Sequence, residues 1–419
     1  MKAQNEVVII GGGIGGLTLA LALHQRGVPF RVYEAVPQIK PLGVGLNLLP
    51  HAMRELAALG LDAELRGLGI ETREYCFFTR HGQLVQSEPR GRFAGYEHPQ
   101  VAIQRGDLHL ALLRAVHERA GETAVLCGRR CVGVAQDADG VEVQFVDPDG
   151  VALPSVRGAV AIACDGVNSV VRLQMHPKEA VPRYEGTTQY RGTTRWKPYL
   201  SGATHFYLGT NETGKLVMYP IREDIDGEGT QLINWVIEVV RPMEQLQRDW
   251  NRRAEVGDFI HHFEHARFDW LDIPALMRAA EAVYEYPMID QDPLPFWTQG
   301  RVSLLGDAAH PMMPRGSNGS AHAIIDATTL AALLAGGADP VAALTAYEAQ
   351  RLQATSDVVL ANRQIAPDAI LRVVEERTGG QPFERIEDVI SPEELDQWQA
   401  RYKKVAGFSL DDVGRRVKA

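Results

Sequence analysis

Residues 7–16 read VVIIGGGIGG, and this stretch decides the fold. Four apolar residues, typical of a buried parallel strand, lead into the pattern G-x-G-x-x-G at Gly11, Gly13 and Gly16. A helical pattern over residues 17–26 follows at once. The glycines allow a tight turn, close approach of the backbone to a pyrophosphate, and close packing of helix on strand. The stretch therefore predicts a dinucleotide-binding βαβ unit.

The residue after the second strand supports this prediction. The strand expected over residues 30–33 ends in Glu34, the acidic residue that would bind a ribose hydroxyl. The diphosphate would lie at the helix N-terminus, beside Ile14 and Gly15, where free N–H groups and the helix dipole favour negative charge. The alternative is a glycine turn without a ligand, and it accounts for neither the strand, the helix nor the carboxylate.

Composition narrows the class of protein. A chain of 419 residues exceeds one ordinary core and favours two domains, and 45% hydrophobic with 23% charged residues is typical of soluble enzymes. The net charge of −10 argues against nucleic-acid and membrane partners, so an anionic substrate would need a local arginine. The four cysteines form no C-x-x-C pair, no apolar run approaches a membrane span, and no signal peptide precedes the first strand. We expect a cytoplasmic monomer or homodimer.

The apolar patterns predict an α/β fold with an interrupted first domain. Helical patterns cover residues 51–58, 106–120, 319–334 and 342–365, and a hairpin is expected around Asp139-Gly140. Alternating runs between 180 and 290 indicate an antiparallel sheet. We therefore predict a Rossmann-like nucleotide-binding domain (1–75, 98–180 and 290–375), an inserted, mostly antiparallel substrate domain (76–97 and 181–289) and a C-terminal helical tail (376–419).

Two further motifs stand at strand ends. Asp165-Gly166 follows a buried strand, with Ser169 placed to cap the next helix and Arg172 to offer a charge to phosphate. The second, GDAAHP at residues 306–311, contains Asp307, whose carboxylate suits ribityl hydroxyls. A helix begins near Gly319, and its N-terminus would stabilise negative charge on a planar ring.

The three motifs, in this order, resemble those of class A flavoprotein monooxygenases, the FAD-dependent aromatic hydroxylases related to para-hydroxybenzoate hydroxylase. The resemblance covers residues 7–363. Within the family, PLGVG at 41–45, SEPRG at 87–91, YPM at 286–288, DPLP at 292–295 and Asn318-Gly319 resemble the phenazine-modifying branch, which acts on 5-methylphenazine-1-carboxylate.

The resemblance implies FAD as cofactor, NADPH or NADH as reductant and O2 as oxidant. No second G-x-G-x-x-G appears, as expected of a family without a separate nicotinamide domain, and the Asp165 motif would serve both FAD and NAD(P)H. The residues expected to bind the cofactor are Gly11, Gly13, Ile14, Gly15, Gly16, Glu34, Gly43, Val44, Arg105, Asp165, Gly166, Asp307, Pro311, Gly316, Asn318 and Gly319.

The implied reaction is hydroxylation of a small planar aromatic or heteroaromatic substrate through a flavin hydroperoxide. Pro311 would lie beside the flavin ring, and Arg191 and Tyr207 complete the expected catalytic set; the expected substrate-binding residues are Tyr190, Arg191, Tyr207 and Tyr219. An arginine beside aromatic rings suits a planar aromatic acid, whereas a surface charge is the alternative for Arg191 or Arg195. The family often has Trp at position 190, an uncharged residue at 315, and Gln or an apolar residue at 322, where this chain has Tyr, Arg and His.

Other classes of protein could carry the same motifs. An FAD-dependent oxidase or reductase without oxygen insertion could use the same cofactor site, and so could a flavin-binding protein without turnover. Two-dinucleotide disulfide reductases are disfavoured because the second glycine motif and C-x-x-C are both missing. His261 and His265 would share a helix face, but no acidic or cysteine partner completes a site, so we expect no metal.

Overall fold

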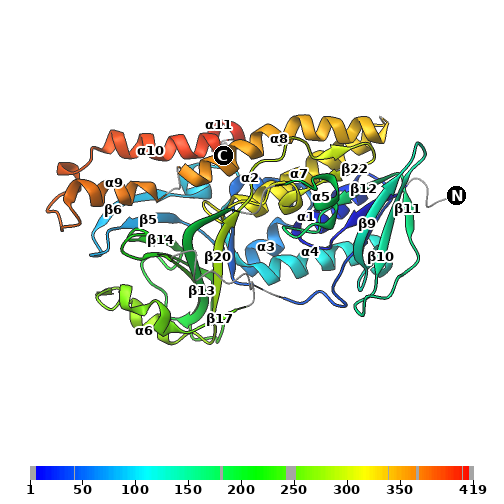
Figure 1. The fold of residues 1–419 in the computed structure, drawn as a ribbon. Coiled ribbons are helices and arrows are strands. Elements are labelled where there is room, and N and C mark those ends of the chain that lie inside the picture. The colour runs from blue at the N-terminus through cyan, green and yellow to red at the C-terminus, as the bar shows by residue number, and fades with distance from the viewer. Residues whose placement is uncertain are drawn as a thin grey trace.

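The computed structural model describes residues 6–41, 43–179, 183–241, 252–337, 339–364, 368–407 and 409–414. Leu42 of the PLGVG stretch lies outside these residues. Figure 1 shows an elongated molecule in which a parallel sheet and a larger antiparallel sheet lie at opposite ends, with long helices along one side.

The parallel sheet is built from the strands that the glycine motifs follow. In the described part of the chain it has six strands, all parallel except the β21–β22 pair. Their order is β21 (Thr298–Gln299), β22 (Val302–Leu304), β12 (Val160–Ala163), β1 (Val7–Ile10), β2 (Phe30–Tyr33) and β8 (Val125–Leu126). Strands β1, β12 and β22 are adjacent and parallel, so the three predicted motifs, which follow these strands, lie together at one edge of the sheet.

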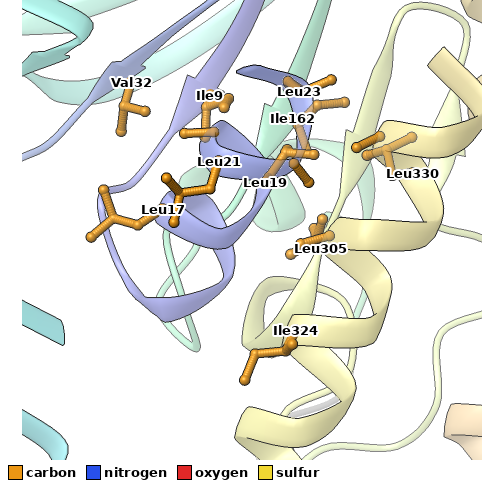
Figure 2. Packing of buried hydrophobic residues seen from close by; sticks show 14 of the residues in the cluster. Ile9, Leu17, Leu19, Leu21, Leu23, Val32, Ile162, Leu305, Ile324 and Leu330 are labelled. Atoms are coloured by element: carbon orange, nitrogen blue, oxygen red, sulfur yellow. The ribbon is translucent and has the colours of Figure 1, made fainter. Parts of the chain in front are cut away.

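Helices α1 (Ile14–Gln25), α4 (Arg105–Ala120), α7 (Asn318–Ala335) and α8 (Pro340–Gln364) accompany this sheet. Helix α1 is apolar on all sides because it is enclosed by the sheet, α4 and α7. Figure 2 shows Leu19 and Leu23 of α1 near Leu330 of α7, with Ile9 and Ile162 on the strands. The predicted helices over 106–120, 319–334 and 342–365 are confirmed to within two residues where they are described, and that over 51–58 is α2 (Pro50–Ala58).

The antiparallel sheet predicted over 180–290 is confirmed. It has eight strands in the described part of the chain: β17 (Arg253–Ala254), β20 (Val283–Asp290), β13 (Arg183–Trp196), β16 (Gln231–Val240), β15 (Lys215–Arg222), β14 (Thr204–Leu208), β5 (Glu74–Phe78) and β6 (Leu84–Pro89). Only the β14–β5 pair is parallel. Strands β5 and β6 come from an earlier part of the chain, before the run of residues 180–290.

The two faces of this sheet differ in character. One face is apolar, contains Trp235 and Tyr190, and is covered by α6 (Ile273–Arg278) and the turns before it. The other face contains Tyr207 and Tyr219; α9 (Ala369–Thr378) and α10 (Pro392–Val405) cover its β5–β14 end. Figure 1 shows α6 and α9 on opposite sides of the sheet. The domain division stays a prediction, and α9 packs on the antiparallel sheet.

A small sheet of β3 (Gly45–Leu48), β7 (Val101–Gln104) and β4 (Ile70–Glu71) connects the two large ones. Strand β7 packs on β15 through Ala102, Tyr219 and Ile221. The remaining elements are α3 (Asp62–Leu68), α5 (Val170–Met175), α11 (Leu410–Val413), β18 (Arg267–Phe268) with β19 (Leu271–Asp272), and a three-stranded sheet of β9 (Arg130–Gln136), β10 (Val141–Val146) and β11 (Val156–Gly158). Strands β9 and β10 form the hairpin predicted at Asp139-Gly140.

Candidate active site

The turn between β1 and α1 explains the three glycines separately. Gly11 has φ +104°, and a Cβ there would lie 2.5 Å from the Cys164 carbonyl oxygen. A Cβ at Gly16 would overlap the Gly11 carbonyl oxygen. A Cβ at Gly13, by contrast, would meet nothing within 4 Å. Gly11 and Gly16 are therefore required by the fold, whereas Gly13, the residue that precedes Ile14 at the start of α1, borders open space.

Glu34 lies beside this turn but already has protein partners. Its carboxylate accepts hydrogen bonds from the backbone N–H of Gly12 at 2.6 Å and of Val36 at 2.9 Å. The ring of His109, on α4, donates from Nε2 to the Gly12 carbonyl oxygen at 2.6 Å, and burial lowers the pKa of this imidazole. Sequence reasoning missed His109, because only the packing of α4 against α1 brings it to the glycine turn.

The Asp165-Gly166 turn has the predicted cap and one role to correct. Ser169 Oγ accepts from the backbone N–H of Arg172 at 3.0 Å, as expected. The Arg172 guanidinium, however, is buried; it pairs with Glu179 and donates to the carbonyl oxygens of Ala308 and Ala309 at 3.0 Å. Arg172 therefore holds the backbone that follows Asp307 in place, and its guanidinium is not available to a phosphate.

Asp165 itself presents an unsatisfied oxygen. Its Oδ2 accepts from the Val170 backbone N–H at 3.2 Å, while Oδ1 is buried without a hydrogen-bond partner among the described residues. Burial raises the pKa of this carboxyl group. Gly166, with φ +78°, makes the turn possible.

Asp307 lies on a 3-10 turn, Gly306–Ala308, at the end of β22. Its side chain is accessible to water, yet burial raises the pKa of its carboxyl group, an effect that His310 and Arg105 partly offset. A side chain that lines an internal cavity is expected to be accessible to water and yet to have its pKa raised by the surrounding protein. An added Cβ on Gly319, in the first turn of α7, would lie 3.9 Å from Asp307 Oδ1, so this helix begins beside the carboxylate.

The other predicted cofactor residues surround the same region, with one exception. The Arg105 N–H donates to the Val44 carbonyl oxygen at 3.0 Å, and its side chain packs on Gly43, which has φ +100°. Pro311 is buried, and the loop after it turns at Gly316 before Asn318 begins α7. Gly15 is the exception, because it faces Leu305 and Ala323 and serves the packing of α1.

A buried polar network lies behind this loop and accounts for His322. Asp326 on α7 bonds His310 Nε2 at 2.5 Å and Arg351 Nε at 2.7 Å. Arg351 also reaches His322 Nδ1 at 2.9 Å. Burial, with Arg351 as a further cause, lowers the pKa of His322 well below its usual value, so the ring is a neutral acceptor. His322 therefore supports α7, and it is not placed in the substrate region.

Arg191 lies on the polar face of the antiparallel sheet. Its guanidinium donates to Gln189 Oε1 from Nε at 2.9 Å and from Nη2 at 2.5 Å, and its Cζ lies 5.3 Å from the Tyr286 ring centroid. Burial lowers the pKa of Arg191, while Tyr219, Tyr286 and Glu238 raise it. No carboxylate among the described residues forms an ion pair with it. Arg191 is thus a partly buried cation held by a neutral amide.

The structure corrects the expectation that Tyr190 binds substrate beside Arg191. Adjacent residues of a strand point to opposite faces, and Tyr190 is buried against Phe259 on the apolar side. Arg195 has 62% of its side chain exposed and faces Glu281, so it fits the surface-charge alternative.

Tyr219 and Tyr207 lie on the same face of the sheet as Arg191 and belong to one stack of aromatic rings. His205 lies between them, with ring centroids 4.5 Å from Tyr219 and 4.9 Å from Tyr207. Tyr219 is therefore the end of the stack next to Arg191, and Tyr207 is farther away, packed on Phe77 at 5.0 Å.

Two asparagines were missed by the sequence reasoning. Asn47 on β3 is buried, and neither amide atom has a hydrogen-bond partner among the described residues. Asn234, opposite Tyr219, accepts from the Gly45 N–H at 2.7 Å, and its Nδ2 has no such partner. Their sequence signal was an amide side chain within a strand of apolar residues. A buried polar group requires a hydrogen bond, so such an amide indicates a position with a partner to find.

The residues present fit a flavin dinucleotide. The open space at Gly13, the unpartnered Asp165 Oδ1 and the enclosed but accessible Asp307 carboxylate lie along the carboxyl ends of β1, β12 and β22. The contact of each residue with the cofactor stays a prediction. The described residues contain no cluster of three metal-ligating side chains, and His261 lies on a 3-10 turn, not on the α-helix the spacing required. Within the same residues, no helix has the length and apolarity to cross a membrane.

Comparison with known proteins agrees with this geometry. The sequence model of a family described as FAD binding domain matches residues 4–362. The chain is 39% identical to phenazine 1,6-dicarboxylic acid hydroxylase PhzS of Lysobacter antibioticus, over 86% of this chain and 89% of that protein. It is 32% identical to 3-hydroxybenzoate 6-hydroxylase of Polaromonas naphthalenivorans, over 87% and 88%.

Solved structures have the same fold. A variant of Klebsiella pneumoniae HpxO complexed with FAD superposes with a TM-score of 0.71 at 25% identity, covering 97% of this chain and 95% of that one. A salicylate hydroxylase substrate complex superposes with a TM-score of 0.73 at 22% identity, covering all of both chains.

Proposed function

Because the chain belongs to the FAD binding domain family and its relatives are aromatic hydroxylases, we propose that it hydroxylates a planar aromatic acid of the phenazine-carboxylate class. The chain is an FAD-dependent monooxygenase, and FAD, NAD(P)H and O2 are its cofactor and cosubstrates. The substrate class is the proposed part. The name of the phenazine dicarboxylic acid hydroxylase supports it, and so does the chemistry of the polar sheet face.

Bound FAD supplies the activation of O2, and the chain's residues hold the reactants and exclude water. The N-terminus of α1 and the open side of Gly13 would accept the diphosphate. Asp307 would accept hydrogen bonds from ribityl hydroxyls, and Asp165 Oδ1 would bond a cofactor donor. Pro311 and the N-terminus of α7 would lie beside the ring system.

The single observation behind the substrate class is the unbalanced charge of Arg191. Arg191 is only partly exposed, and a cation in such a place is normally paired, because removing a charge from water is costly. Its only side-chain hydrogen bonds among the described residues go to the neutral Gln189 amide. A substrate carboxylate would supply the missing negative charge through the planar fork that arginine offers. Tyr219 and Tyr286 on either side provide aromatic surface for a flat ring.

The test measures NAD(P)H oxidation and product formation with phenazine-1-carboxylate, phenazine-1,6-dicarboxylate and 3-hydroxybenzoate. We expect an oxygenated product from a carboxylated ring, with NAD(P)H and product in equal amounts. Hydrogen peroxide without product would support the oxidase or reductase alternative, and absence of any turnover would leave a flavin-binding protein.

Arg191→Ala tests the carboxylate contact. It should raise KM for the acid about tenfold or more while sparing the decarboxylated analogue, since a charge-assisted hydrogen bond contributes about 1.5–3 kcal/mol. Arg195→Ala is the matched control, because it removes an exposed arginine from the same strand. Equal effects of Arg191→Ala on both ligands, or a loss of FAD instead, would contradict the assignment.

The proposal includes a cytoplasmic monomer or homodimer that binds neither nucleic acid nor membrane. The net charge of −10 supports the absence of nucleic-acid and membrane partners. Size-exclusion chromatography with light scattering tests the oligomeric state.

A further inference from the structure

Four side chains form one row across the polar face of the antiparallel sheet. Strand register places Gln189 of β13 between Tyr286 of β20 and Glu238 of β16. Glu238 in turn lies opposite Lys215 of β15. Arg191, two positions after Gln189 on the same face, leans over this row toward Tyr286.

The negative charge of Glu238 is committed to other cations. Its carboxylate lies 2.7 Å from Lys215 Nζ and 4.0 Å from Arg315 Nη2. Burial would raise the pKa of Glu238, but Lys215 and Arg315 outweigh this effect and lower it to about 2. Lys215 has a second partner, Asp368, at 2.9 Å.

Glu238 also fixes the orientation of Gln189. Gln189 Nε2 donates to Glu238 Oε1 at 2.6 Å, so the amide oxygen points to Arg191 and accepts both of its hydrogen bonds. A flipped amide would place oxygen against carboxylate and NH2 against guanidinium, which leaves no hydrogen bond on either side. The orientation of the amide is therefore determined.

We propose that Gln189 is a positioning residue that determines specificity for anionic substrates, because it anchors Arg191 through a neutral acceptor and leaves the guanidinium charge to the substrate carboxylate. This inference rests on the proposed function. The neighbouring carboxylates agree with this role: Glu238 and Asp368 both pair with Lys215, and neither forms an ion pair with Arg191 among the described residues.

Gln189→Glu tests the inference, since it places a carboxylate where the neutral amide anchors Arg191. The new carboxylate also meets Glu238, to which the Gln189 amide donates, so the variant should unfold at a lower temperature than the wild type, and the ligand preference decides the test. The Kd of the oxidised holoenzyme for phenazine-1-carboxylate, followed by the flavin absorbance change, should rise about tenfold or more. The Kd for phenazine, which has no carboxylate, should change less than about twofold.

Two further variants separate positioning from general packing. Gln189→Met keeps the volume and the Arg191 charge but removes the anchor, so it should weaken the acid less than Gln189→Glu does. In an Arg191→Ala background, Gln189→Glu should no longer change the ratio of the two Kd values, because its target is gone. A role in folding alone would weaken the binding of both ligands equally in either background.

The outcomes keep this inference distinct from the proposed function. If the wild type binds phenazine-1-carboxylate no better than phenazine, the proposed substrate class fails. If the wild type prefers the acid and Arg191→Ala abolishes the preference while Gln189→Glu leaves it intact, only the role of Gln189 is overturned. Equal weakening of both ligands by Gln189→Glu overturns it as well.

Discussion

Replacing Gly13 and Gly16 separately should divide cofactor binding from folding. At Gly13 the backbone is extended, with φ −76°, and a methyl group meets no atom within 4 Å. Alanine lowers the entropy of the unfolded chain but is a poorer helix N-cap than glycine. These effects oppose each other, so Gly13→Ala should change the unfolding free energy of the apoprotein by less than about 1 kcal/mol. The same methyl group occupies the proposed diphosphate position, so FAD affinity should fall by more than about 100-fold.

At Gly16 the added methyl group overlaps the Gly11 carbonyl oxygen. The position of a Cβ is fixed by its own backbone and the Gly11 oxygen is a backbone atom, so no side-chain rotation relieves the contact and α1 must move away from β1. Gly16→Ala should therefore destabilise the apoprotein by about 3 kcal/mol, the upper end of the usual cost of overpacking.

Urea unfolding of both apoproteins and titration of each with FAD, followed by flavin fluorescence, measure the two effects. The reasoning is refuted if Gly13→Ala binds FAD with wild-type affinity, because the diphosphate then does not lie over Gly13. It is also refuted if Gly16→Ala is as stable as the wild type.

Three other predictions follow from single side chains. Asp307→Ala should weaken FAD about ten- to a hundredfold, because buried cofactor donors lose their acceptor; unchanged affinity of a folded variant in the same fluorescence titration would contradict this. Arg172→Ala should destabilise the protein by about 3–5 kcal/mol in urea unfolding, since Glu179 loses its buried partner; Arg172→Lys is the control, and an unchanged midpoint for Arg172→Ala would refute the role. Burial, followed by Arg54 and Arg351, lowers the pKa of His51 to about 3, so below pH 6.5 the unfolded chain binds a proton that the folded chain does not, and stability falls as the pH drops. His51→Gln should therefore reduce the stability lost between pH 7 and 5 by about 2 kcal/mol; an identical loss in both proteins would refute this.

Local chemistry made much of the nucleotide half predictable. The strand, turn and helix around Gly11 follow from apolar runs and glycine spacing, and Ser169 caps α5 because a hydroxyl at that position is satisfied by the next turn. Arg172 could not be read in the same way. Its sequence position suggested phosphate, but its partners are carbonyl oxygens about 136 positions away in the chain, at Ala308 and Ala309.

The sequence by itself determined the α/β class, the order of the three motifs and the residue types proposed for the cofactor site, because each follows from patterns within about twenty residues. Only the tertiary structure decided which side chains face the substrate region. Strand register places Gln189, which holds Arg191, beside Glu238 and Tyr286, which come from the two neighbouring strands. Partial burial then sets the electrostatic role of Arg191, because a guanidinium that has lost part of its water is stabilised by a counter-ion, whereas a fully exposed one needs none.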